Sequence, residues 1–254
     1  NSARQAAAGN SVHAKGKSIS TSNLTLPIVP DGLGKGGLQV SSSIKTDPSQ
    51  WTGAKAPVQT VSGSKTKVTI KQTESQALLT WDSFNVGKNT TLTFDQSKGG
   101  ADTSKWIAFN KINDPSGNPT QILGSIKADG QVYVINQNGI IFGGSSQVNA
   151  RGLTVSSLPI NDNLIQRGIL NNPDAQFLFS ALTVPGGVDG TPDFNPGAPP
   201  ASGHYGDVTV EAGAVLTSPA GSGGNGGRIM LVGPNVTNNG TISTESGQTC
   251  RNTK

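Results

Sequence analysis

The chain carries a single cysteine, Cys250, among its 254 residues, which excludes an internal disulfide and a cysteine-based metal site. Histidine is also scarce: His13 and His204 lie in irregular segments, without the spacing of a metal site or a catalytic triad. No apolar run approaches the roughly 18 residues that would cross a membrane, so no transmembrane segment is expected. Stability must come from packing and from backbone hydrogen bonds.

Charged residues make up 13% of the chain and aromatic residues only 5%. The net charge of +4 comes from basic residues that never form a block of five, which indicates a dispersed basic surface and no nucleic-acid partner. The carboxylates occur singly, not in the pairs that a glycosidase or a calcium site needs: Asp82, Asp95, Asp102, Asp114 and Asp129. We therefore predict no catalytic residues, no metal and no cofactor.

What the chain does have is glycine, serine, threonine and asparagine, with 34 glycines alone. This composition predicts an all-β fold with many turns. From Val58 onward, short apolar or alternating runs follow one another closely, as strands do. We expect strands near residues 67–72, 77–81, 90–94, 106–109, 122–126, 132–135, 140–142 and 153–158.

A spacing of 21 residues recurs between apolar positions of these runs. It separates Val132 from Leu153, and later it separates Val208 from Ile229, Val210 from Leu231 and Val215 from Val236. Repeating β units of about 20 residues with glycine and asparagine at the corners indicate a parallel β-solenoid, in which each coil stacks on the one before. A β-sandwich is the alternative fold, although it favours hairpin turns every 8 to 12 residues.

The composition also divides the chain. Residues 1–57 are predicted to form an N-terminal extension and cap, and residues 58–248 the β-helix domain. Within that domain, the proline- and glycine-rich residues 161–205 are predicted to form an insertion outside the coil. Residues 249–254 are expected to be a tail left by truncation or by a tag, and the start at Asn1 fits a processed or a recombinant protein.

The most informative short segment lies between two apolar runs and consists of Asn136, Gln137, Asn138, Gly139 and Ile140. Strand formers precede and follow it, and an Asn-Gly pair tolerates positive φ, so the segment predicts strand, tight turn, strand. Taken alone, this turn is a hairpin or a corner. The repeated spacing around it favours a corner of the solenoid.

Three phrases, Gln72–Gly87, Ile126–Ile140 and Val236–Thr244, occur in the order in which a known family has them. Through them, the chain resembles the two-partner secretion (TPS) domain over Val58–Gln248. This domain, also called the haemagglutination activity domain, lies at the N-terminus of filamentous haemagglutinins and of other TpsA-type exoproteins and adhesins. The family signature reads Asn-Pro-Asn-Gly-Ile, whereas this chain has Gln137 at the second position. Losing the proline frees φ there and adds an amide to satisfy.

The resemblance implies a secretion-targeting domain without enzymatic activity. Its partner would be an outer-membrane TpsB transporter, whose periplasmic POTRA domains recognise the chain. The chain would then fold into a right-handed, single-stranded parallel β-helix at the surface of a Gram-negative bacterium or outside it. Nothing beyond that folding is needed to drive export, because each coil gains contacts with its neighbour. We expect strand addition to a sheet edge as the mode of recognition.

The resemblance assigns the secretion motif to residues 136–140 and a secondary motif to Trp81, Phe84 and Asn85. The two motif asparagines, Asn136 and Asn138, could bind the transporter or could only cap buried backbone groups at the corner. The rings of Trp81 and Phe84 are expected in the core. Two other functions stay open: a carbohydrate-binding adhesin module, with host or matrix carbohydrate as partner of the full-length protein, and, less favoured, a polysaccharide-active β-helix enzyme.

Overall fold

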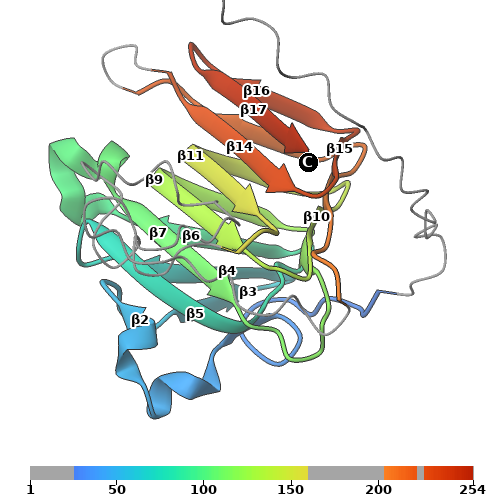
Figure 1. Ribbon diagram of the computed structural model, residues 1–254. Coiled ribbons are helices and arrows are strands. Elements are labelled where there is room, and N and C mark those ends of the chain that lie inside the picture. Colours follow the sequence, from blue (N-terminus) through green and yellow to red (C-terminus); the bar gives the residue numbers. More distant parts are fainter. Residues whose placement is uncertain (1–25, 160–202, 222–225, 254) are drawn as a thin grey trace, which may run out of the picture.

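The computed structural model describes residues 26–159, 203–221 and 226–253 (Figure 1). Nearly all regular structure in these ranges is β-strand, so the predicted all-β class is confirmed. Three short 3-10 helices complete it: η1 (Ser42–Lys45), η2 (Pro48–Gln50) and η3 (Ser97–Lys105). The strands are β1 (Leu38–Val40), β2 (Trp51–Thr52), β3 (Val58–Ser62), β4 (Lys65–Lys71), β5 (Gln76–Phe84), β6 (Thr90–Asp95), β7 (Ile107–Ile112), β8 (Thr120–Ile122), β9 (Ser125–Ile135), β10 (Ile140–Phe142), β11 (Gln147–Ser156), β12 (Val208–Val210), β13 (Val215–Ser218), β14 (Arg228–Gly233), β15 (Val236–Asn238), β16 (Thr241–Thr244) and β17 (Gln248–Thr253).

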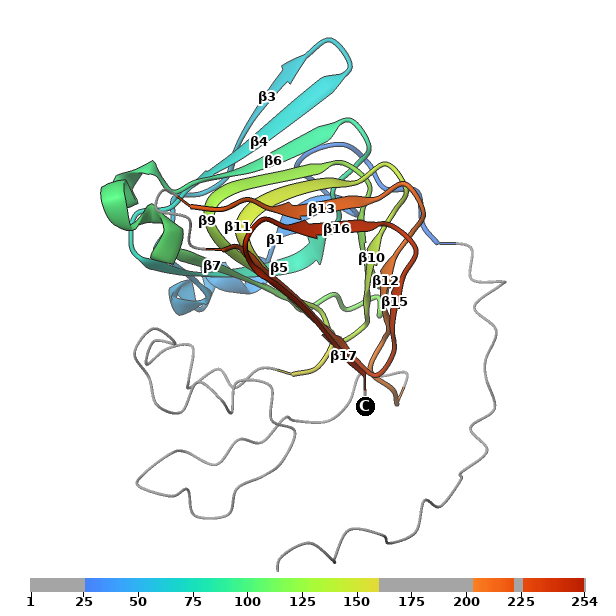
Figure 2. The same cartoon turned by 90° about the horizontal axis from the view of Figure 1, so that it is seen from above.

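The strands stack in three parallel ladders, which enclose a triangular interior in Figure 2. The first ladder contains β5, β7, residues 131–135 of β9, residues 152–156 of β11, β14 and β17. The second contains β4, β6, the first half of β9, the first half of β11, β13 and β16. The third contains β8, β10, β12 and β15. Parallel pairing between sequence-distant strands argues against the β-sandwich alternative.

The strands β9 and β11 each contribute to two ladders because both bend near the middle. The register between them shifts between Ala150 and Gly152, where Ala150 faces Ala128 and Gly152 faces Gln131. A shift of this kind is a β-bulge, and a bulge bends the strand that carries it. One corner of the triangle is therefore made by a bend within a strand, and the corner between β9 and β10 by the turn at residues 136–139.

The prediction that residues 21 apart pair on successive coils is confirmed at one place and wrong at the others. Leu153 does pair with Val132. Val208, however, pairs with Val236 in the third ladder, whereas Ile229 pairs with Leu153 in the first. Val210 and Leu231 are likewise on different ladders, and Val215 pairs with Thr241. The corners differ in length from coil to coil, so equal spacing in sequence does not mean equal position on the coil.

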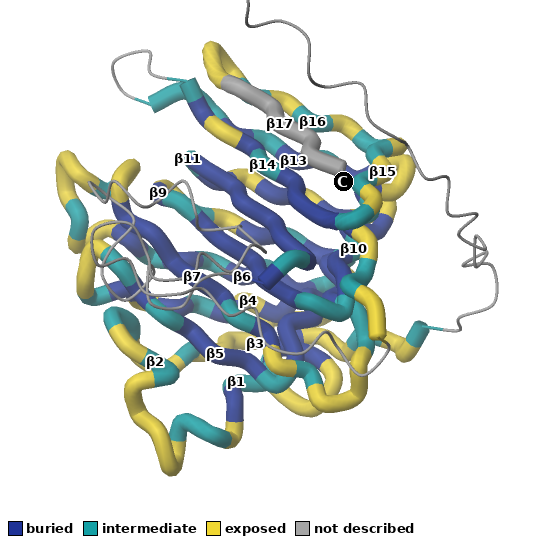
Figure 3. The backbone as a smooth tube through the Cα atoms, in the orientation of Figure 1, coloured by how far each residue is buried: buried dark blue, intermediate teal, exposed yellow. Residues whose placement is uncertain are grey.

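The apolar side chains that point into the triangle form one core. Val68, Ile126, Val148 and Leu216 fill it from the second ladder, and the corresponding side chains of the other ladders meet them. The residues between them alternate outward, as the burial of β4 and β6 shows. Figure 3 shows the buried residues running along the stacked strands β5, β7, β9 and β11. Each fully buried aliphatic or aromatic side chain contributes about 1.5–3 kcal/mol.

Antiparallel strands cover the N-terminal edge of the stack. Leu38 of β1 pairs with Phe84, and Trp51 of β2 pairs with Leu79, so both strands lie along β5. The strand β3 pairs with β4 in an antiparallel hairpin, which projects from the triangle in Figure 2. The edge of β5 is thereby paired with two very short strands, and short edge strands are a common protection against aggregation.

Two of the predicted segments, residues 161–205 and residues 249–254, overlap the described residues only in part. The insertion predicted at residues 161–205 lies almost wholly outside them. At the other end, residues 249–253 do not stand apart from the domain: they belong to β17, which pairs in parallel with β14. The first ladder therefore extends past the predicted boundary at Gln248, because the final strand continues the register of β14. No helix in the described ranges is long and apolar enough to cross a membrane.

Candidate functional site

The motif residue Asn136 is buried, and its side chain builds the corner between β9 and β10. Its Oδ1 accepts a hydrogen bond from the backbone amide of Asn138 at 2.9 Å, and its Nδ2 donates to Oγ1 of Thr120 at 3.0 Å. The backbone carbonyl of Asn136 accepts from the amide of Gly139 at 3.0 Å. This is an Asx turn tied to the neighbouring coil. The side chain is 1% exposed, so it cannot touch a partner of the folded domain.

The next two residues, Gln137 and Asn138, are half-buried and lie at the surface of the corner. The side chain of Asn138 makes one long contact, from Nδ2 to the carbonyl of Asp114 at 3.4 Å. The carbonyl of Gln137 accepts from the amide of Gly206 at 2.8 Å. Within the motif, the structure therefore separates one buried asparagine from two side chains that reach the surface.

Gly139 and Ile140 pass the chain into β10, which pairs with β8 and β12 and not with β9. The motif is thus a corner and not a hairpin. Of the predicted Asn-Gly pair, only Gly139 has positive φ, at 107°, and a side chain there is strained. Gly139 accepts from the amide of Thr120 at 3.0 Å, and Ile140 donates to Asp207 at 3.0 Å. The corner is therefore held from both neighbouring coils.

Trp81 and Phe84 of the secondary motif are both fully buried at the end of β5. The ring centroids of these two residues are 5.2 Å apart in an edge-to-face arrangement, and Trp51 packs against Trp81 in the same way at 5.1 Å. The indole Nε1 of Trp81 donates to Oδ1 of the buried Asn110 at 3.1 Å. Because neither ring is exposed, their role in the folded domain is core packing.

Asn85 joins the N-terminal cap to the third ladder. Its Oδ1 accepts from the amide of Gln121 at 2.7 Å, and its Nδ2 donates to the carbonyl of Gly36 at 3.0 Å. Its own amide donates to Gly37 at 3.1 Å. Asn85 therefore holds three separate segments together at one point.

An Asn85→Ala variant should lose about 1–3 kcal/mol of stability, because the buried amide of Gln121 loses its acceptor. An Asn85→Asp variant keeps the acceptor for Gln121 but turns a carboxylate oxygen toward the carbonyl of Gly36 in place of the Nδ2 donor, so it should also be destabilised while the Gln121 amide stays protected. Urea unfolding measures both losses, and hydrogen exchange at the Gln121 amide reports the contact itself. An amide of Gln121 that is equally protected in wild type and in Asn85→Ala would contradict this role.

The strand β8 connects the two motifs. Thr120 receives the side chain of Asn136, and the neighbouring Gln121 binds Asn85. Ile122 also pairs with Val86, the residue after Asn85. Neither Thr120 nor Gln121 was predicted from the sequence, and neither was Gly206. The available signal was a short apolar run close after them in the sequence, Ile122-Leu123 in one case and Val208-Thr209-Val210 in the other.

Two of the dispersed aspartates make local contacts: Asp114 accepts from Ser116, and Asp102 forms an ion pair with Lys105 at 2.7 Å. Asp82 instead accepts from Ser41 and so binds the N-terminal cap to β5. The hydroxyl and the amide of Ser97 donate to Asp95, and these hydrogen bonds lower the pKa of that carboxyl. Among the described residues, no group of three or more histidine, cysteine or acidic side chains could hold a metal ion.

Comparisons with known proteins identify the family. The model of the TPS secretion domain matches residues 42–250, which is most of the chain. The chain is 35% identical over 91 residues to a heme/hemopexin-binding protein of Haemophilus influenzae, and 33% identical over 87 residues to the protein of that name from the Rd strain. These alignments cover 36% and 34% of this chain. The chain spans about 9% of the length of these relatives.

Among solved structures, the HMW1 secretion domain from Haemophilus influenzae is similar, with 19% identity and a TM-score of 0.47 over 76% of this chain and 40% of that one. TPS domains belong to proteins that the two-partner systems of Gram-negative bacteria secrete. Since the family model covers residues 42–250, the chain belongs to the TPS secretion domain family, the secretion-targeting module of TpsA-type exoproteins rather than an enzyme.

Proposed function

We propose that POTRA domains of an outer-membrane TpsB transporter recognise this domain at the corner of residues 136–140. The family match supports a TpsB partner. The main observation in favour of this site is that the motif residues differ in exposure. Asn136 is buried and builds the corner, whereas Gln137 and Asn138 reach the surface. A partner could therefore contact Asn138 without dismantling the fold.

We further infer that the domain is a right-handed, single-stranded parallel β-helix. Three parallel ladders around one core support this, since successive turns of the chain add strands to the same ladders, and the third ladder receives one from each of the four turns that contain β8, β10, β12 and β15. A strand in such a stack contacts the coils before and after it. The chain passes through the periplasm to the transporter, and folding can then propagate coil by coil as the chain emerges at the cell surface or in the extracellular space.

The division of the chain belongs to the same proposal. Residues 1–57 act as the N-terminal extension and cap, of which residues 26–57 are described. Residues 58–248 form the secretion domain with an insertion at about 161–205. The antiparallel strands β1 and β2 along β5 support the capping role. Deletion of residues 1–57 should give a protein that aggregates, as size-exclusion chromatography would show.

Secretion of Asn136→Ala and Asn138→Ala variants, with and without the cognate barrel, tests the recognition site. Asn136→Ala should destabilise the domain by about 1–3 kcal/mol because it leaves the amide of Asn138 without its acceptor. Asn138→Ala removes one long hydrogen bond and should cost less than about 1 kcal/mol. We expect Asn138→Ala to fold normally and to secrete poorly.

The measurements are secreted yield, urea unfolding of the purified domain and binding to isolated POTRA domains. Gln121→Ala serves as a control, because Gln121 lies on the neighbouring strand and belongs to neither motif. Normal secretion of Asn138→Ala would overturn recognition at this residue. A secretion defect that only follows the loss of stability would leave the motif with a purely structural role.

Carbohydrate binding remains the alternative function. The aromatic rings that sugars would need for stacking are largely buried: Trp81, Phe84, Phe109 and Tyr133 are each at most 3% exposed. The observation that favours a carbohydrate ligand is instead a cleft with cationic side chains on the outside of the first ladder.

A further inference from the structure

A cleft of ≈ 820 Å³ opens on the outer side of the first ladder, where its strands begin. We call it the basic cleft; its lining residues come from the end of η3, from β9, β11 and β14, and from the turns before β14 and β17. Gln131, Gly152 and Arg228 occupy the same register position on three successive strands. The cleft therefore follows the direction in which the strands stack. Its volume is in the range of known ligand sites.

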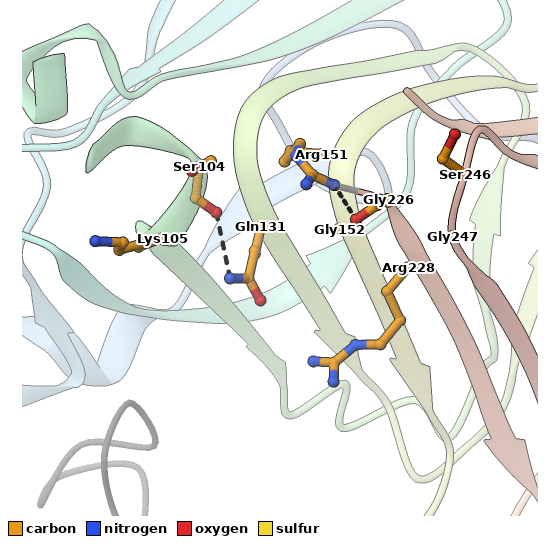
Figure 4. A pocket seen from close by; sticks show the side chains of 10 residues that line it. Ser104, Lys105, Gln131, Arg151, Gly152, Gly226, Arg228, Ser246 and Gly247 are labelled. Atoms are coloured by element: carbon orange, nitrogen blue, oxygen red, sulfur yellow. Dashed lines mark hydrogen bonds between the residues drawn. The ribbon is translucent and has the colours of Figure 1, made fainter. Parts of the chain in front are cut away.

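Gly152 makes room for the cleft. It lies between Gln131 and Arg228 in the ladder, and a Cβ at this position would be 3.1 Å from Cγ of Gln131. The side chain of Gln131 is fixed by a hydrogen bond from Nε2 to the carbonyl of Ser104 at 3.3 Å. The floor of the cleft is therefore the backbone of Gly152, which has no side chain, and the fixed side-chain amide of Gln131 lies beside it (Figure 4).

Three cationic side chains surround this floor. Lys105 lies at one end, and Arg151 and Arg228 project from β11 and β14 (Figure 4). Arg151 is held in place because its Nη1 donates to the carbonyl of Gly226 at 2.7 Å. Arg228 is exposed. None of the described residues that line the cleft is acidic or aromatic.

Two carboxylates nearby offset part of this charge. Asp102 forms an ion pair with Lys105 at 2.7 Å, but both side chains are about two-thirds exposed, at 66% and 69%, and exposed pairs are weak enough for Lys105 to exchange Asp102 for an anionic ligand. The hydrogen bond from Lys105 to Asp102 raises the pKa of the lysine, so the amine stays protonated. Glu245, which precedes the lining residue Ser246, accepts from the amide of Ala220 at 3.3 Å.

The spacing of the three cationic residues along the ladder indicates an extended ligand. Lys105 precedes β7 and Arg228 begins β14, and these strands are three spacings apart in the ladder. With about 4.8 Å between strands, the cations extend over about 14 Å. A small anion would contact one or two of them, because Arg151 and Arg228 lie on adjacent strands, whereas a chain with an acidic group on successive units can meet all three. Guanidinium groups match carboxylates and related oxyanions in geometry.

We propose that the basic cleft binds a linear acidic polysaccharide, which lies along the direction of strand stacking. Single-stranded nucleic acid is the other extended polyanion, but its binding sites present aromatic rings on which bases stack. The described lining of the cleft has none. The proposal is independent of secretion targeting, because the cleft is lined by the first ladder and none of the motif residues 136–140 takes part.

Titration calorimetry of the whole domain with heparin and with polygalacturonate, at low and at high salt, tests the proposal. The cleft variant Lys105→Ala/Arg228→Ala should bind about tenfold more weakly, because two charge-assisted contacts are lost. The matched control is Lys67→Ala/Lys127→Ala, which removes the same charge from exposed positions of the second ladder. The control should change affinity less than about twofold.

Equal weakening in both double variants would show diffuse attraction to a basic protein and would overturn the site. Absence of binding by the wild type to both polysaccharides would overturn it as well. Oligothymidylate is the third probe: if it binds as tightly as heparin and depends equally on Arg228, the cleft accepts any polyanion and the polysaccharide assignment is wrong. Thermal unfolding of each variant confirms that the fold is intact, and both cleft substitutions are at exposed side chains.

Discussion

Replacing Gly206 by alanine is expected to destabilise the domain by about 3 kcal/mol or more, which is at the severe end for a single added methyl group. A Cβ on Gly206 would overlap the backbone carbonyl of Asn138 and the amide nitrogen of Gly139. Neither can move aside, because Gly139 accepts from Thr120 and Ile140 donates to Asp207 on opposite sides of the corner. The added atom would therefore separate two coils at the secretion motif.

Gly203→Ala is the matched control for this prediction. Gly203 also precedes β12, but no atom of the described residues lies within 4 Å of a Cβ at this position, where φ is 74°. A left-handed conformation alone costs an alanine about 1–2 kcal/mol. Urea unfolding midpoints should thus fall further for Gly206→Ala than for Gly203→Ala. Equal midpoints would mean that the corner tolerates the methyl group and that the coils are less closely stacked there than the structure shows.

Trp81→Ala is expected to destabilise the domain by about 3–5 kcal/mol, because it opens a large cavity in the core. Trp81 is fully buried between Trp51 and Phe84, and its indole nitrogen is bonded to Asn110. The substitution also leaves Oδ1 of Asn110 without that donor. On the proposed export route the domain folds after it leaves the transporter, so a loss of this size should reduce the yield of folded secreted protein.

Two further substitutions separate the contributions of Trp81. Trp81→Phe keeps an aromatic ring and removes the hydrogen bond, and it should cost about 1–3 kcal/mol. Trp51→Ala removes the half-buried partner ring, so it should cost less than Trp81→Ala. Chemical denaturation of the three variants measures these differences. A cost for Trp51→Ala equal to that for Trp81→Ala would place the centre of this cluster in the cap and not in β5.

The features that the sequence revealed are those encoded locally. Alternation along β4 and β6 follows from side chains that point to opposite faces of a strand. The turn at residues 136–139 follows from the tolerance of Gly139 for positive φ, and the burial of Trp81 and Phe84 follows from their size. Each of these predictions needs only the residue itself and its near neighbours in the chain.

The features that escaped prediction depend on how the coils stack. Nothing local distinguishes Val208, in the third ladder, from Ile229, in the first. Thr120 and Gln121 gain their roles only because β8 comes to lie between Asn85 and Asn136. Gly206 is required because another backbone passes directly against it. Such relations are set by corner lengths, for which a single sequence offers no rule.

The stacking of Gly206 and Asp207 on the motif has a consequence for the timing of folding. The amide of Gly206 donates to the carbonyl of Gln137, and the carbonyl of Asp207 accepts from the amide of Ile140. Gly206 and Asp207, however, come later in the chain than β11 and are separated from it by residues 160–202. If the domain follows the proposed export route with its N-terminus first, the motif would form at first as a half-closed corner, in which the carbonyl of Gln137 and the amide of Ile140 are bonded to water. The corner would close only when Gly206 and Asp207 arrive. The length of the intervening chain would then set a delay, during which the secretion motif offers free backbone groups.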